Sequence, residues 1–153
     1  MTTEHGDTAE AYSLLLDDQL CFALYAASRA VTARYRPLLD ELGLTYPQYL
    51  VMLVLWDRDS VSVRDIGTAL QLESSTLSPL IKRLETAGLV LRQRRADDER
   101  SVTVSLTDEG RSLRNRARCV PTAIGDAMGL TPQQHEAAKD ILRLLTTNVS
   151  RVG

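Results

Sequence analysis

Residues 61–106 constrain the fold most, because they contain two short helical patterns separated by only three residues. Ser62 stands where a helix N-cap is favoured, and apolar residues follow it at helical spacing. After the turn at 71–73, a second helical pattern begins at Ser74 and ends at Gly88, a residue suited to the left-handed backbone that follows a helix. Two short helices joined by such a turn are typical of a helix-turn-helix.

A pair of strands is predicted directly after the second helix. Residues 89–95 have the pattern of one strand, and residues 96–100 form a polar turn. Residues 101–106 alternate strictly between polar and apolar, as a strand with one buried face does. A hairpin in this place is a wing, so we expect a winged helix-turn-helix over 61–106.

Helical patterns flank this unit on both sides. One begins at Leu20 and is expected to end near Pro37, and another covers 47–56 and is apolar almost all round, which predicts burial. After the wing, a helix is expected to be interrupted at Pro121, and the last helix begins at the capping pattern 131–134. The expected fold class is therefore mostly α with a small β-hairpin wing (α+β).

We expect a single domain over residues 13–153, preceded by a flexible tail of residues 1–12 that is polar and acidic. The apolar stripes of 13–45 and 108–150 exceed what one small DNA-binding module needs. Packing within the chain is the simpler explanation. Dimerisation through both regions is the prediction, because an operator with two half-sites requires two recognition helices one DNA turn apart.

Charge is distributed unevenly along the 153 residues. The net charge is −2, but residues 1–60 carry −5 and residues 82–118 carry +4. Affinity for phosphates depends on where the cations lie rather than on their total, so DNA remains a partner. The longest apolar run, 49–56, is too short to cross a membrane, and two cysteines fit a reducing cytoplasm better than a disulfide scaffold.

The first turns of the second helix carry short hydroxyl side chains, which allow close approach to phosphates and base edges. Basic side chains follow on this helix and along the wing, where Asp98 can pair with Arg100 and aim its guanidinium at a minor groove. The alternatives are that the hydroxyls are helix caps and that the wing pair is an exposed ion pair of little consequence. The candidate DNA-binding residues are Ser74, Ser75, Thr76, Ser78, Pro79, Lys82, Arg83, Arg92, Arg94, Arg95, Asp98 and Arg100.

Two motifs in and after the wing resemble a known family. Arg-x-x-Asp-Asp-Glu-Arg-Ser-Val at 94–102 and Leu-Thr-Asp-Glu-Gly at 106–110 are similar to the wing and following helix of the MarR transcription regulators. Asp98 and Arg100 match the Asp-x-Arg of that family. The resemblance implies a homodimer that binds a pseudo-palindromic operator in duplex DNA.

Three further segments, 18–25, 35–40 and 44–49, resemble a narrower branch of the family, the organic-hydroperoxide-sensing repressors OhrR. They include Leu-Cys-Phe and Thr-Tyr-Pro-Gln-Tyr, which are not generic helical patterns. The resemblance implies a repressor of a peroxide-resistance gene. Organic hydroperoxides would be its inducer, and it would release DNA when one cysteine is oxidised.

In this resemblance Cys21 matches the sensing cysteine, and Tyr25, Tyr35 and Tyr46 match tyrosines that surround the thiol. Phenolic O–H groups can stabilise a thiolate without supplying a cation. Apolar neighbours such as Phe22 favour bulky organic hydroperoxides over hydrogen peroxide. Attack on the peroxide gives sulfenic acid, which a second thiol can capture as a disulfide.

The second cysteine, Cys119, is a candidate resolving cysteine across the dimer, because some members of the branch use one in the C-terminal helical region. The alternative is a bystander thiol, with external thiols capturing the sulfenic acid. His5 and His135 are far apart and lack neighbours at ligand spacing. No metal and no other cofactor is therefore predicted.

Two rival functions remain open. A MarR-type regulator released by a small phenolic or aromatic ligand would use Tyr25, Tyr35, Tyr46 and Trp56 as pocket walls, with Cys21 inert. A thiol peroxidase would use the cysteine catalytically, but it has no use for a winged unit with basic residues. The prediction is a regulator and not an enzyme.

Overall fold

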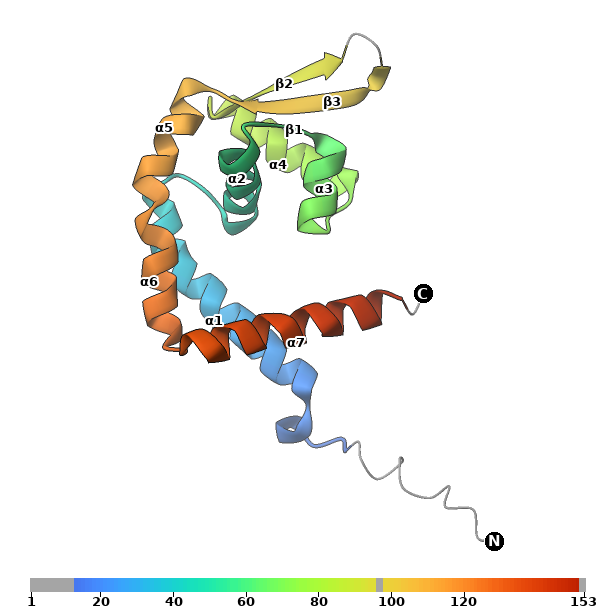
Figure 1. Cartoon of the computed structure of the whole chain (residues 1–153), viewed down its shortest axis with the longest axis vertical. Coiled ribbons are helices and arrows are strands. Elements are labelled where there is room, and N and C mark those ends of the chain that lie inside the picture. Colours follow the sequence, from blue (N-terminus) through green and yellow to red (C-terminus); the bar gives the residue numbers. More distant parts are fainter. Residues whose placement is uncertain (1–12, 96–97, 152–153) are drawn as a thin grey trace, which may run out of the picture.

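The computed structural model describes residues 13–95 and 98–151, without the side chains of Arg95 and of residues 98–100. The predicted tail (1–12) and part of the predicted wing turn (96–97) lie outside the described residues. In Figure 1 a winged unit lies at one end of the molecule and long helices extend away from it.

The winged unit consists of two helices and a three-stranded antiparallel sheet, which confirms the predicted helix-turn-helix, wing and fold class. The elements are β1 (Ser60–Ser62), α3 (Val63–Leu70), α4 (Ser74–Thr86), β2 (Val90–Arg95) and β3 (Asp98–Leu106). The strands lie in the order β1-β3-β2, so β1, which precedes the two helices, pairs with β3, the second strand of the wing.

Local capping chemistry explains where α3 and α4 begin and end. Ser62 Oγ accepts the amide N–H of Asp65 at 3.0 Å, which confirms the predicted N-cap of α3. Gly88, just past α4, has a φ of +81°, a left-handed conformation that costs glycine little. Thr107 Oγ1 then donates to the Gly88 carbonyl at 2.6 Å, which ties the start of the next helix to this turn.

Two strand boundaries differ from the prediction. Strand β3 begins at Asp98 and not at Ser101, because Arg95 pairs with Asp98 and extends the hairpin through most of the expected turn. Strand β1 was not predicted, since three residues are too short to show an alternating pattern. Its central residue, Val61, is buried opposite Val104 of β3.

The remaining elements form an N-terminal pair of helices and a C-terminal series of three. The first residues described also contain a short 3-10 turn. These elements are η1 (Leu16–Asp18), α1 (Leu20–Asp40), α2 (Tyr46–Arg58), α5 (Asp108–Ala117), α6 (Cys119–Met128) and α7 (Pro132–Ser150).

The prediction that the first helix ends near Pro37 is wrong, because this residue lies inside α1. Proline removes one backbone hydrogen bond. The last turn is nevertheless held by Leu39, which is 2% exposed and packs into the core. Helix α2 begins as predicted, with a capping box in which Thr45 and Gln48 each bind the other's backbone N–H.

The predicted interruption at Pro121 is present, but the break itself lies at Arg118, three residues earlier. Pro121 has no N–H for the carbonyl of Ala117, the last residue of α5, and it falls in the first turn of α6, where the missing N–H costs no intrahelical bond. The start of α7 has the predicted capping box between Thr131 and Gln134.

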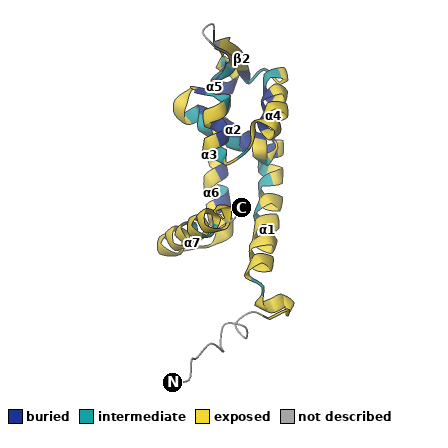
Figure 2. Cartoon of the chain, turned by 90° about the vertical axis from the view of Figure 1, so that its right-hand side faces the viewer, coloured by how far each residue is buried: buried dark blue, intermediate teal, exposed yellow. Residues whose placement is uncertain are grey.

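The core surrounds α2, whose Val51, Met52 and Leu55 are completely buried. A hydrogen bond joins α5 to α2: Trp56 Nε1 of α2 donates to the Gly110 carbonyl of α5 at 2.9 Å. Figure 2 shows that buried residues concentrate in the winged unit and around α2, α5 and α6, whereas α7 and the lower half of α1 are almost entirely exposed.

Large apolar side chains are therefore uncovered at the ends of this chain. Helix α7 has no buried residue among those described. In the part of the chain that the structure describes, no helix combines the length and apolar character that crossing a membrane requires. The exposed side chains on α1, on α7 and just before α7 are Leu20, Phe22, Leu24, Tyr25, Leu130, Ile141, Leu142, Leu144 and Val149.

Candidate functional sites

The exposed face of α4 carries the predicted hydroxyl cluster. The helix buries Leu77, Ile81 and Leu84, each about 1% exposed, against the rest of the winged unit. Burial of this stripe turns the opposite face to solvent. The solvent-facing predicted residues are Ser74, Ser75, Thr76, Ser78, Pro79, Lys82 and Arg83.

The capping alternative for the hydroxyl cluster is wrong. The N-cap of α4 is Glu73, and its side chain makes no capping hydrogen bond. Ser78 Oγ donates to the Ser74 carbonyl at 2.9 Å, one turn back. The hydroxyl of Ser78 is thereby anchored while its oxygen can still accept a hydrogen bond.

On the wing, the predicted arginines fall into two groups. Arg94 is exposed on β2. Arg92 instead pairs with Glu85 of α4, at 3.1 Å from its Nη2 and 3.2 Å from its Nε. The predicted pairing of Asp98 with Arg100 lies outside the described side chains, as does Arg95, so these three residues stay predictions.

A polar groove of about 660 Å³ lies between α3, α4 and the wing. Ser74 and Ser78 line it from α4, and Arg92 and Ser101 line it from the wing. Arg64, exposed in the first turn of α3, lines the third side and was not predicted. The signal was available, because the first helix of a helix-turn-helix crosses the DNA backbone and a cation at its start suits a phosphate.

Cys21 lies exposed in the first turn of α1, with a free thiol. Phe22 beside it is 44% exposed, and Tyr25, one turn along, is 59% exposed. The Tyr25 ring lies under the guanidinium of Arg29, which is 5.5 Å from the ring centroid. The thiol therefore stands in an open, apolar and aromatic stretch of helix.

The other two predicted tyrosines belong to a separate aromatic cluster. Tyr35 and Tyr46 have ring centroids 4.8 Å apart, and Tyr49 lies 5.7 Å from Tyr35. Trp56 extends the cluster, 6.3 Å from Tyr49. Tyr49 was not predicted, although it lies one turn from Tyr46 on the same helix.

Burial raises the pKa of two phenols of this cluster, Tyr35 and Tyr49. Desolvation raises the pKa of Tyr49 to about 12, with smaller contributions from the neighbouring phenols. Burial, followed by the charge of Tyr46, also raises the pKa of Tyr35. At neutral pH these hydroxyls are therefore hydrogen-bond donors.

Within one chain the structure does not bring Cys21 together with Tyr35 and Tyr46. Fourteen residues of a single helix separate Cys21 from Tyr35, which is about 21 Å at 1.5 Å per residue. Of the predicted thiol pocket, one chain thus assembles only Cys21, Phe22 and Tyr25.

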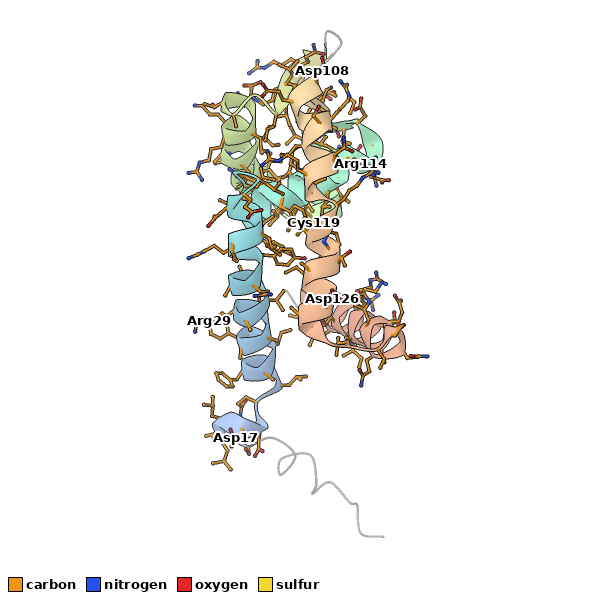
Figure 3. All side chains as sticks on the ribbon, turned by 90° about the vertical axis from the view of Figure 1, so that its left-hand side faces the viewer. Asp17, Arg29, Asp108, Arg114, Cys119 and Asp126 are labelled. Carbon is orange, nitrogen blue, oxygen red and sulfur yellow. The ribbon has the colours of Figure 1, made fainter. Side chains whose placement is uncertain are left out.

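Cys119 is exposed and lies at the junction of α5 and α6, in the helix column that runs beside α1 in Figure 3. Nearby, Arg116 Nη2 donates to the carbonyl of Glu41 at 2.6 Å, just past the end of α1. Cys21 lies at the other end of that helix, roughly 30 Å along its axis. A disulfide requires Cα atoms within about 7 Å, so these two cysteines cannot pair within one chain.

The winged helix-turn-helix and its basic exposed face define a DNA-binding regulator. The sequence profile of the family described as "Transcriptional regulator SarA/Rot" matches residues 33–117. The organic hydroperoxide resistance transcriptional regulator of Bacillus subtilis (strain 168) is 46% identical over 132 residues, covering 86% of this chain and 88% of that protein. The chain belongs to the MarR family of transcriptional regulators, as the sequence predicted.

Two further relatives agree with this assignment. The HTH-type transcriptional regulator TtmR of Methylorubrum extorquens (strain PA1) is 50% identical over 127 residues, covering 83% of this chain but 65% of the longer TtmR. Reduced AbfR of Staphylococcus epidermidis bound to DNA has a TM-score of 0.75 and 34% identity, over 90% of this chain and 94% of that one. AbfR has also been solved in overoxidized and disulfide forms.

Proposed function

We propose that this protein is a homodimeric repressor that holds its operator while Cys21 is reduced and releases it when an organic hydroperoxide oxidises that thiol. The observation that carries the proposal is the placement of Cys21, accessible beside Phe22 and Tyr25. Similarity to an organic hydroperoxide resistance regulator supports it. The reducing cytoplasm is the compartment in which such a thiol starts reduced.

The chemistry requires the thiolate, the peroxide and a proton from water. The sulfur attacks the terminal peroxide oxygen, the O–O bond breaks, and the leaving alkoxide takes that proton to become an alcohol, so that Cys21 becomes a sulfenic acid. The exposed apolar side chain of Phe22 favours peroxides with organic groups. After one equivalent of cumene hydroperoxide, mass spectrometry is expected to find the added oxygen, or a disulfide derived from it, on Cys21. Oxidation confined to Cys119 would refute the proposal.

A second subunit completes the thiol pocket in this proposal. Tyr35 is a protonated donor but lies about 21 Å from Cys21 of its own chain, and Tyr46 packs against Tyr35. Two copies packed through the exposed apolar faces of α1 and α7 can bring the tyrosines of one chain to the thiol of the other. Sedimentation of the reduced protein is expected to give twice the mass of the chain, and a monomer at micromolar concentration would contradict the dimer.

The operator contacts are proposed for the exposed face of α4 and for the wing. On this proposal, Lys82→Gln and Arg83→Gln each weaken binding to all duplexes, because each removes a phosphate contact. The slope of log affinity against log salt is expected to fall by about 0.9 per lost contact, or about 1.8 per dimer. Fluorescence anisotropy on a duplex selected in vitro with reduced protein measures the slope.

Lys139 of α7 offers a matched control for these two substitutions. It pairs with Glu136 at 2.8 Å on a helix outside the winged unit. Lys139→Gln removes the same charge and is expected to leave the salt slope unchanged. A slope that fell equally in all three variants would mean that net charge, rather than the α4 face, sets the affinity.

A second candidate function is supported by a hollow of about 350 Å³ between α2 and the α5–α6 junction. Tyr49 and Trp56 form its aromatic wall, and Arg114 and Arg118 line it with positive charge. These groups suit an aromatic carboxylate. Of the residues predicted for such a pocket, Trp56 lines it, whereas Tyr25, Tyr35 and Tyr46 do not. Operator release by salicylate in a Cys21→Ser protein, lost again in Arg118→Gln, would establish this rival.

A further inference from the structure

We infer that Glu85 is a positioning residue for DNA binding. Its hydrogen bonds to Arg92, called the clamp below, hold the wing at a fixed distance from α4, the recognition helix. The inference rests on the proposed DNA-binding face of α4 and the wing. It assigns to Arg92 a structural role in place of the direct DNA contact that the sequence predicted.

Three hydrogen bonds form the clamp. Glu85 Oε2 accepts the backbone N–H of Arg92 at 2.9 Å, and its Oε1 accepts from Nε and Nη2 of the same residue at 3.2 and 3.1 Å. One carboxylate thus fixes both the main chain and the side chain of a β2 residue. Leu84 of α4 and Val90 of β2 also belong to the same buried core. The clamp adds a polar contact between the two elements, which resists rotation of the wing about the turn at Ala87–Leu89.

The clamp lies beside the polar groove between α4 and the wing. Arg92 lines that groove opposite Ser74 and Ser78, and Glu85 lines a neighbouring hollow with Arg92 and Arg94. A wing that tilted would change the spacing between the hydroxyls of α4 and the arginines of β2. That spacing must match the distance between a major groove and the adjacent backbone or minor groove.

Because Glu85 is negatively charged, the direction in which DNA affinity changes on its removal distinguishes a positioning role from simple charge repulsion. A carboxylate on the DNA-facing side repels phosphates, so removing it should tighten binding if charge is all that matters. The hydrogen bonds from the Arg92 backbone and guanidinium hold the pKa of Glu85 below its ordinary value. The group is therefore ionised throughout the neutral range, and the clamp and the repulsion are present together.

Glu73 provides a matched control on the same helix. It is an exposed carboxylate at the N-cap of α4, and its side chain makes no capping bond. Glu73→Ala and Glu85→Ala therefore remove the same charge from the two ends of the recognition helix, and only the second removes the clamp.

The experiment measures affinity for the selected operator and for a scrambled duplex, by anisotropy with reduced protein. Glu73→Ala is expected to tighten binding to both duplexes. Glu85→Ala is expected to weaken operator binding about tenfold, or about 1.4 kcal/mol, without weakening scrambled-duplex binding. Glu85→Gln, which keeps an acceptor for the Arg92 N–H, is expected to lie between wild type and Glu85→Ala.

Unchanged or tighter operator binding in Glu85→Ala would overturn the inference. Hydrogen–deuterium exchange without DNA gives a second reading, since release of the clamp should speed exchange in residues 90–95 and 101–106 relative to Glu73→Ala. Equal exchange in the two variants would also overturn it. If wild type itself shows no preference for the selected duplex, the proposed function fails, and the exchange comparison still decides whether Glu85 holds the wing.

Discussion

A Cys21→Ser protein is expected to bind its operator as tightly as wild type and to remain bound when organic hydroperoxide is added. Serine replaces sulfur by oxygen at an exposed position, so neither the fold nor the DNA-binding face should change. The hydroxyl is not a nucleophile toward peroxides at neutral pH, whereas a thiolate is. The substitution therefore separates sensing from binding.

Anisotropy of a labelled operator duplex measures both properties. With cumene hydroperoxide, wild-type affinity is expected to fall at least roughly tenfold, which is about 1.4 kcal/mol, and to return on addition of dithiothreitol. Cys21→Ser is expected to show no change. Release of the variant by peroxide, to the same extent as wild type, would place the sensor elsewhere in the protein.

Cys119→Ser is the companion variant, and it tests the proposed resolving role. Cys21 lies at the start of α1, and Cys119 lies on α6, near the far end of α1. Any bond between the two cysteines must therefore join two subunits. If Cys119 resolves, peroxide gives wild type a reducible dimer band on denaturing gels, and Cys119→Ser lacks that band. Persistence of the band in Cys119→Ser would show that this cysteine is a bystander.

Gly110→Ala is expected to have the largest effect on stability of any single methyl group added to α5. A Cβ at this position would overlap the carbonyl oxygen of Leu89 and press on the Leu106 side chain. Backbone atoms held by neighbouring hydrogen bonds cannot move aside: the Leu89 carbonyl accepts from Thr107 N, and the Gly110 carbonyl accepts from Trp56. The helix must therefore shift away from the winged unit.

Overpacking typically costs about 1–3 kcal/mol in the free energy of unfolding. The overlap with a backbone carbonyl places Gly110→Ala at the upper end, about 3 kcal/mol. Urea denaturation at one fixed protein concentration measures it, because a dimer's apparent stability depends on concentration. Asn115→Ala is the control: this residue is exposed on the same helix, and alanine there should raise stability by about 0.5 kcal/mol. A Gly110→Ala protein as stable as wild type would mean that α5 is not packed against Leu89 as described.

Most helix boundaries were predictable because caps act over four residues. The boxes at Thr45–Gln48 and Thr131–Gln134 are complete in the structure. A predicted helix boundary was wrong where a tertiary contact overrode a local sequence rule. Pro37 lies inside α1 because burial of Leu39 holds the turn that follows it.

The candidate DNA-binding residues on α4 were also predictable from local sequence, because helical periodicity repeats within a few residues. Helical periodicity places Leu77, Ile81 and Leu84 on one face and leaves the hydroxyl cluster on the other. Arg64 and Glu85 were missed because their importance depends on where other elements lie. A carboxylate at 85 becomes a partner of Arg92 only after the chain turns at Gly88 and runs back along α4.

The helix-turn-helix and the wing within residues 61–106 were thus determined by the sequence itself, since the helices, the turn and the alternating strand each have a pattern within a few residues. The third strand, β1, has no such pattern. The tertiary structure alone decided two other matters. It packed Tyr35 of α1 against Tyr46 and Tyr49 of α2, with ring centroids 4.8 and 5.7 Å away, in a cluster apart from Cys21. It also turned Arg92 toward Glu85. Both depend on distances between elements, which periodicity and capping do not specify.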